Sequence, residues 1–263
     1  MSTQTHTAPG NVLEHLGVTV GEVPRLRRFI SATAACADLL TVGVAAGSLA
    51  GWLAGGYLEG RSSPVQASSA PYVFLEPSGG TVATWDCSSP IPLKVNFGRL
   101  DPDLVSAAIE GLTRATRLID SESSFEFHLA GSTDWVPSRS GLTARGRTPD
   151  SGSVVVFFGA IGDTDLLTDP QAIATGGVAA VSDNPSRAGA GYVAVNVDSI
   201  RRLGIASRPE EMERLLAHEL LHVLGLGHVN RRSSVLFPIF HPGRGEIGDG
   251  ERAGLVELAR IGC

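Results

Sequence analysis

Residues 218–228 read HELLHVLGLGH and contain three of the seven histidines in the 263-residue chain. His218 and His222 are four residues apart, so on a helix both imidazoles project from one face and can bind one metal ion. Gly225 follows three residues later, and glycine lets a helix stop and the chain turn back. His228 can then supply a third imidazole from outside the helix. Three neutral imidazoles leave a fourth ligand position open, which is the arrangement of a catalytic rather than a structural zinc site.

Glu219 adds a possible catalytic group to this segment. It neighbours the first histidine and can reach a water molecule at the metal, where a carboxylate can act as a general base. The short His-Glu-x-x-His pattern also occurs by chance in helices that bind no metal. The longer pattern fixes five positions, and three buried imidazoles without a metal would lack a common partner. We therefore predict one catalytic Zn²⁺, with His218, His222 and His228 as its ligands.

The same residues resemble a known family. HELLHVLGLGH matches HExxHxxGxxH, the signature of the metzincin metalloendopeptidases. Residues 234–240, SVLFPIF, are similar to the matrixin turn S-x-M-[YF]-P-x-[YF], with Leu236 in place of the methionine. Trp85-Asp86-Cys87, ahead of Pro90-Ile91, resembles the opening of bacterial matrixin-like domains. Residues 247–258, IGDGERAGLVEL, are similar to the helix that ends matrixin catalytic domains.

The resemblance implies a metzincin-like fold and a zinc-dependent endopeptidase, in which a zinc-activated water attacks the peptide bond and Glu219 is the general base. It also implies that an edge strand pairs with an extended polypeptide substrate, and that residues after the turn form the wall of a pocket beyond the cleaved bond. The substrate-binding residues would then be Gly177, Val178, Ala179, Pro238 and Phe240. Leu236 keeps apolar bulk at the methionine position, and such exchanges in a core are usually mild.

Two other functions remain open. One is a membrane-tethered pseudo-protease that binds zinc and acts as a binding module, although a purely structural zinc site would not need Glu219. The other is a zinc hydrolase that acts on a non-peptide bond. No histidine lies between His128 and His218, so the structural zinc of animal matrixins has no evident ligands. Four acidic residues could support calcium, but acidic loops are more often only solvated: Asp163, Asp165, Asp169 and Asp183.

The element order of residues 72–263 predicts one α/β or α+β domain in which a sheet is backed by helices. The resemblance implies the α+β form, with a twisted mixed sheet. Its apolar patterns predict strands at 91–97, 125–129, 153–158, 177–181 and 192–197. The run at 153–158 is continuously apolar, which is typical of a strand buried on both faces. First-turn prolines, caps and helical spacing predict helices at 101–119, 209–224 and 249–261.

Two cysteines bracket this domain, whereas Cys36 lies in an apolar N-terminal segment. In an exported domain we favour a disulfide between Cys87 and Cys263 over two free thiols. A loop of this length would stabilise the fold by about 4–5 kcal/mol in the chain-entropy model.

The N-terminal part predicts a membrane segment. Residues 39–58 carry no charge over a length that can span a bilayer, and the apolar stretch extends back to Phe29 with only Asp38 inside it. Arginines at 25, 27 and 28 favour an N-terminus inside and the later residues outside. We predict a cytoplasmic tail at 1–28, a signal-anchor helix at 29–58 and a Ser- and Pro-rich linker at 59–71. The alternative is a secreted protein whose signal is cut after Ala67 or Ala70.

Small residues repeat at every fourth position of this segment, at Gly43, Gly47, Gly51 and Gly55. This spacing would let two copies of the helix associate as a homodimer, although a Gly- and Ala-rich span also produces it by chance.

The composition excludes two broad classes. With 43% hydrophobic and 18% charged residues, the chain is not disordered as a whole. Its 21 Lys and Arg against 27 Asp and Glu give a net charge of −6 without a basic block, so we expect no nucleic-acid partner.

Overall fold

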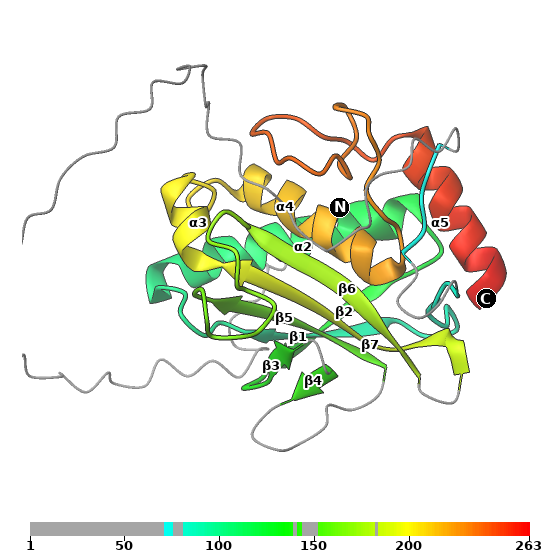
Figure 1. Cartoon of the computed structure of the whole chain (residues 1–263), viewed down its shortest axis with the longest axis horizontal. Helices are drawn as coiled ribbons and strands as arrows, with labels where there is room; N and C mark the ends of the chain where they lie inside the picture. The colour runs from blue at the N-terminus through cyan, green and yellow to red at the C-terminus, as the bar shows by residue number, and fades with distance from the viewer. Residues whose placement is uncertain (1–70, 76–80, 139–140, 144–151, 182–183) are drawn as a thin grey trace, which may run out of the picture.

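The computed structural model describes residues 71–75, 81–138, 141–143, 152–181 and 184–263 (Figure 1). The predicted cytoplasmic tail, the predicted membrane helix with Gly43, Gly47, Gly51 and Gly55, and residues 59–70 of the linker lie outside these ranges. Within them, no helix has both the length and the apolar character needed to span a bilayer.

The described residues form an α+β fold with a mixed five-stranded sheet in the order β2-β1-β5-β7-β6, and a separate two-stranded sheet of β3 and β4. In chain order the elements are β1 (Ile91–Asn96), η1 (Pro102–Leu104), α2 (Val105–Glu122), β2 (Phe127–Ser132), β3 (Val136–Ser138), β4 (Gly141–Thr143), β5 (Ser153–Gly159), β6 (Ala174–Val181), β7 (Asn184–Asn196), α3 (Val197–Arg202), α4 (Pro209–Leu224) and α5 (Asp249–Gly262).

Four strands of the large sheet are parallel and one is antiparallel. β1 pairs in parallel with β2 and β5, and β5 pairs in parallel with β7. Every residue of β5 is buried, as expected for a parallel strand covered on both faces. β6 runs antiparallel to β7 and lies at the edge of the sheet, so within the described residues its outer side has no partner strand.

Two helices cover one face of the sheet and pack against each other (Figure 1). The buried positions of α2 include Ala108, Leu112, Ala115 and Ile119, whose spacing places them on one face of the helix. Gly111 in α2 lies against the Met212 side chain of α4, where a Cβ atom would overlap it. The two helices therefore approach closely over the sheet.

Local sequence explains where α4 begins and ends. Pro209 occupies the first turn, followed by two acidic residues that suit the positive end of a helix dipole. Gly225 ends the helix in the left-handed region at φ 112°, and the N–H groups of Gly225 and Leu226 donate to the carbonyls of His222 and Leu221. A residue with a side chain would be strained at this φ value.

The predicted elements are present, but several differ in length. β6 starts three residues earlier than predicted, β7 starts eight residues earlier at Asn184, and β2 is displaced to Phe127–Ser132. Residue 197, predicted to end a strand, begins α3 instead, because the Asn196 side chain accepts hydrogen bonds from the N–H groups of Asp198 and Ser199 and starts the helix. The β3–β4 hairpin was not predicted.

Cys87 and Cys263 form a disulfide, with their Cα atoms 5.3 Å apart. This is the pairing that the sequence favours. It attaches the end of α5 to the segment before β1, where the Trp85 indole N–H donates to the carbonyl of Val223 in α4 at 2.8 Å.

Candidate metal centre

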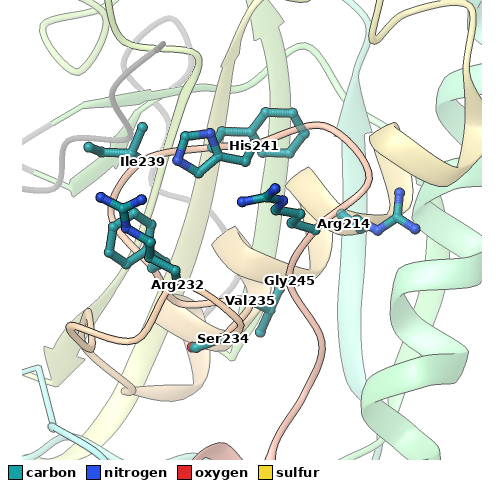
Figure 2. A pocket seen from close by; sticks show the side chains of 10 residues that line it. Arg214, Arg232, Ser234, Val235, Ile239, His241 and Gly245 are labelled. Carbon is teal, nitrogen blue, oxygen red and sulfur yellow. The ribbon is translucent and has the colours of Figure 1, made fainter.

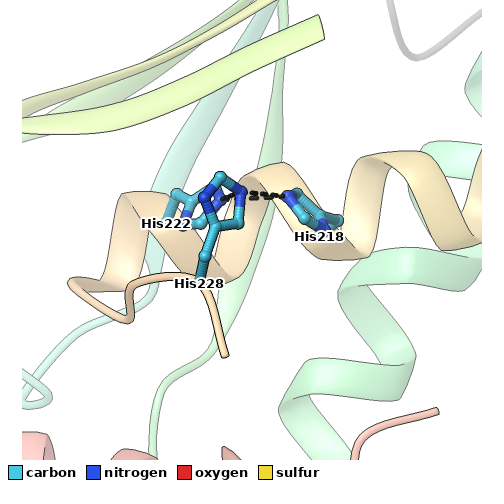
Figure 3. A group of neighbouring side chains, drawn as sticks. All are labelled: His218, His222 and His228. Atoms are coloured by element: carbon cyan, nitrogen blue, oxygen red, sulfur yellow. Dashed lines mark hydrogen bonds between the residues drawn. The ribbon is translucent and has the colours of Figure 1, made fainter. Parts of the chain in front are cut away.

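Three histidine side chains meet at the C-terminal half of α4 (Figure 3). His218 and His222 project from the helix, and His228 approaches from the loop after Gly225. Their Nε2 atoms lie 3.0 Å apart for His218 and His222, 3.1 Å for His222 and His228, and 3.2 Å for His218 and His228. All three side chains are buried, with exposed fractions of 1% to 6%. These nitrogens form a group that could bind one metal ion.

Backbone carbonyls determine the tautomer of the two helical histidines. The Nδ1 atom of His218 lies 2.6 Å from the carbonyl oxygen of Val235, and that of His222 lies 2.6 Å from the carbonyl oxygen of Leu226. A carbonyl oxygen can only accept, so each Nδ1 donates and each neutral ring keeps its Nε2 lone pair. Such partners orient metal-bound imidazoles and increase their basicity.

The surroundings keep all three imidazoles neutral at pH 7. Burial, followed by the proximity of His222 and His228, holds the pKa of His218 well below its usual value. Burial lowers the pKa of His222 to about 4. Burial and the nearby His222 lower the pKa of His228 to about 3. Neutral imidazoles are the form that binds metals.

The geometry of the nitrogens fits a tetrahedral ion. With Zn–N bonds of about 2.0–2.1 Å, two ligands of a tetrahedral zinc are about 3.3 Å apart. The three observed separations of 3.0–3.2 Å are close to this value. Three imidazoles without carboxylate or thiolate ligands suit zinc and other divalent transition ions. They do not suit calcium or magnesium, which prefer oxygen ligands.

Glu219 lies beside the first ligand and is 1% exposed. Within the described residues, its Oε1 atom has no hydrogen-bond partner. Burial raises the pKa of Glu219 to about 8, while a hydrogen bond from the N–H of Gly176 acts in the opposite direction. A cation bound by the neighbouring histidines would lower this pKa, because it stabilises the carboxylate.

Glycines in the sheet allow α4 to approach the edge strand. A Cβ atom on Gly176 would lie 2.5 Å from the carbonyl oxygen of Glu219, and one on Gly191 would lie 2.7 Å from a methyl group of Val223. β6 and the backbone of Glu219 are therefore in direct contact.

The turn at residues 234–236 supports the metal centre through its backbone. Val235 accepts from His218, and the carbonyl of Leu236 accepts from the N–H of Val229, one residue after His228. The Ser234 hydroxyl accepts from the N–H of Leu236 at 2.9 Å and donates to the buried carboxylate of Glu251 in α5. Leu236 itself is 1% exposed and belongs to the main hydrophobic core.

The segment at residues 73–75 supports the loop that carries His228. The N–H of Gly227 donates to the carbonyl of Val73, and the N–H of Leu75 donates to the carbonyl of Gly225, both at 2.7 Å. Two chain segments about 150 residues apart therefore form this part of the centre.

The predicted substrate-binding residues lie in two places. Gly177, Val178 and Ala179 are in the edge strand β6. Phe240 lines a hollow beside the 234–236 turn, together with Arg214, Arg232, Ser234, Val235, Phe237, Ile239, His241, Arg244 and Gly245 (Figure 2). Pro238 lies in the same loop but is not part of this lining.

The acidic residues considered for calcium do not form a cluster in the described part of the chain, where the three histidines are the one group of possible ligands. Asp163 pairs with the Arg99 guanidinium at 3.0 Å and accepts from the N–H of Ala160. Asp169 accepts from the N–H of Gln171. Asp183 lies outside the described residues.

The structure adds contacts at the centre that sequence reasoning did not assign, namely those of Gly176, Trp85, Ser234 and Glu251. A glycine pair inside a strand can indicate close approach of another backbone, and this signal was present at Gly176-Gly177. A scan against protein-family models and a search of curated proteins both find no match to this chain.

Proposed function

We propose that this chain is a zinc-dependent endopeptidase of the metzincin type, with a matrixin-like domain at residues 72–263. One observation carries the proposal: three buried Nε2 atoms converge within 3.2 Å, beside a carboxylate with one oxygen that has no partner among the described residues. His218, His222 and His228 would bind the ion. Bound zinc would supply a Lewis acid that polarises a carbonyl group and lowers the pKa of a water molecule.

In this proposal Glu219 acts as the general base. Its carboxylate takes a proton from the attacking water and returns it to the leaving amine. Gly176 would position this group, because Gly176 contacts the backbone of Glu219 and the N–H of Gly176 donates to the Glu219 carboxylate. His218 and His222 are oriented for ligation by the carbonyls of Val235 and Leu226.

The position of the edge strand supports a peptide as substrate. An extended polypeptide can add to the outer side of β6 through main-chain hydrogen bonds. Gly177, Val178 and Ala179 would supply these bonds, and the adjacent contact with α4 would bring the paired chain to Glu219. Phe240 would border the hollow that takes a neighbouring side chain, and Pro238 would lie in the same loop without lining it.

We further propose that the domain lies outside the membrane on a single N-terminal helix, with secretion after signal cleavage as the alternative. The Cys87–Cys263 disulfide supports an oxidising compartment. Protease protection on intact cells, followed by N-terminal sequencing of the mature protein, distinguishes the two arrangements.

The peptidase proposal is tested with the purified full chain. We expect one zinc per chain by elemental analysis, and cleavage of an unfolded protein that a chelator abolishes and zinc restores. Glu219→Gln should retain zinc but lower kcat by about 10²–10⁴-fold. Glu210→Gln, an exposed glutamate on the same helix, is the matched control and should behave as wild type.

The outcomes separate the alternatives. A wild-type chain that binds no zinc, or a Glu219→Gln variant as active as wild type, refutes the peptidase mechanism. Zinc binding without cleavage of any peptide supports the zinc-binding module instead. Loss of zinc from His228→Ala, with zinc retained in the exposed control His128→Ala, tests the ligand set independently of activity.

A further inference from the structure

We propose that the hollow beside the metal centre binds an acidic side chain of the substrate, so that the enzyme prefers Asp or Glu close to the cleaved bond. This inference rests on the proposed peptidase function and adds a substrate class to it. The hollow is bordered by Arg214, Arg232 and Arg244, around the turn at Ser234-Val235 (Figure 2).

A single residue, Val235, separates the hollow from the proposed metal ligand His218. Val235 lines it, and the carbonyl of the same residue binds Nδ1 of His218 at 2.6 Å. Arg214 precedes His218 by four residues on α4, so both side chains lie on one face of the helix, one turn apart. A substrate side chain next to the reacting bond could therefore reach these arginines.

Arg232 and Arg244 form a positive site that the described residues do not neutralise, whereas Arg214 lies 3.4 Å from the Glu211 carboxylate. A larger adjoining hollow of about 460 Å³ shares the same three arginines. Within the described residues, the guanidinium groups of Arg232 and Arg244 have no ion-pair or hydrogen-bond partner, and both side chains are exposed. Carboxylates bind such planar donors in strong, charge-assisted hydrogen bonds.

Two glutamates, Glu211 and Glu246, lie near these arginines, and Glu211 already has hydrogen-bond and ion-pair partners. Glu211 accepts from the N–H of Gly243 at 2.9 Å and lies 3.4 Å from Arg214. It also lies 3.9 Å from Arg208. Glu246 lines the larger hollow and is exposed. Arg232 and Arg244 remain available to a ligand.

The other side of the hollow is apolar and aromatic. Phe237, Ile239 and Phe240 line it, and the Phe237 ring stacks with His241 at 6.0 Å between centroids. This apolar part is narrow, at about 20 Å³, so the carboxylate of Glu or Asp would lie in the larger adjoining hollow that the same arginines border. Its methylene groups would extend past these apolar side chains. A basic side chain would meet like charges, so we expect Glu and Asp to be preferred to Gln, and Gln to Lys.

The test uses the full chain loaded with zinc, and a peptide whose cleavage site has been mapped by mass spectrometry. Glu, Gln and Lys are placed in turn at each position near the cleaved bond, and kcat/KM is measured. At one position we expect Glu to exceed Gln by roughly two- to fivefold, as for partly exposed charge pairs. This ratio should fall as the salt concentration rises.

Three variants locate the preference. Arg232→Ala and Arg244→Ala should each reduce the Glu-to-Gln ratio, and Arg232→Glu should shift the preference toward Lys. Arg231→Ala is the matched control, because Arg231 is adjacent and exposed but does not line either hollow, and the ratio should stay at the wild-type value. Equal zinc content and circular dichroism spectra show that the variants are folded.

Cleavage with equal rates for Glu and Gln at every position overturns the acidic preference and leaves the peptidase proposal intact. An acidic preference that Arg232 and Arg244 substitutions do not change also overturns it. If the zinc-loaded wild type cleaves no peptide, the peptidase proposal fails, and this inference fails with it.

Discussion

Replacing Gly176 with alanine would place a methyl group between the edge strand β6 and the backbone of Glu219. The added Cβ would lie 2.5 Å from the carbonyl oxygen of Glu219, and 3.0 Å from its carbonyl carbon and its Cα. An ordinary contact is at least 3.4 Å, so strand and helix would have to separate by about 0.9 Å.

Such a movement is unfavourable because both sides of the contact are backbone. Overpacking in a well-packed interior typically costs about 1–3 kcal/mol. We therefore expect Gly176→Ala to lower the free energy of unfolding by about this amount. The Gly176 N–H would also move away from the Glu219 carboxylate, so kcat should fall even in molecules that retain zinc.

Urea unfolding followed by circular dichroism gives the change in stability, and elemental analysis with peptide cleavage gives zinc content and kcat. Gly177→Ala is the matched control. Its Cβ would meet the end of the Tyr192 side chain, at 2.7 Å from the hydroxyl oxygen, and a side-chain end can move more easily than backbone. Gly177→Ala is the control for stability only, because Gly177 belongs to the proposed substrate-binding strand. If Gly176→Ala is as stable as Gly177→Ala and as active as wild type, the contact between β6 and α4 does not position Glu219.

Three further predictions concern the surroundings of the three histidines. Leu236→Met should change the free energy of unfolding by less than about 1.5 kcal/mol, whereas Leu236→Ala should lower it by about 2–5 kcal/mol in urea unfolding. Ser234→Ala removes a partner of the buried Glu251 carboxylate and should cost about 1–3 kcal/mol in the same assay. The metal-free chain should be most stable at about pH 6.5. Below this pH unfolding exposes histidines, such as His222 and His228, that take up protons, and above it unfolding lets Glu219 release its proton. Unfolding curves that do not change between pH 5 and 8 would contradict the last prediction.

Much of the fold could be predicted because its signals are local. The continuous apolar run at 153–158 predicts the central strand β5, and Pro209 with Gly225 predicts both ends of α4. The three histidines could be predicted as one group for the same reason, since a helix and one turn set their spacing.

The unpredicted parts depend on contacts between distant segments. Residues 184–190 are polar and rich in turn-forming residues, yet they extend β7. Thr84 exchanges backbone hydrogen bonds with Ser186 and Ala188, about 100 residues later in the chain. In the same way, the role of Trp85 depends on the distance between sheet and helix, which no local pattern encodes. The glycine pair at 176–177 indicates a close approach but not which backbone approaches it.

We expect the leucine at position 236 to be compatible with metal binding by the three histidines, because the turn is fixed by atoms that do not depend on that side chain. The N–H of Leu236 binds the Ser234 hydroxyl, its carbonyl binds the N–H of Val229, and the carbonyl of Val235 binds His218. The side chain at 236 contributes only buried apolar volume, and leucine and methionine are similar in this respect. The position therefore requires an apolar side chain of this size and does not require the thioether sulfur.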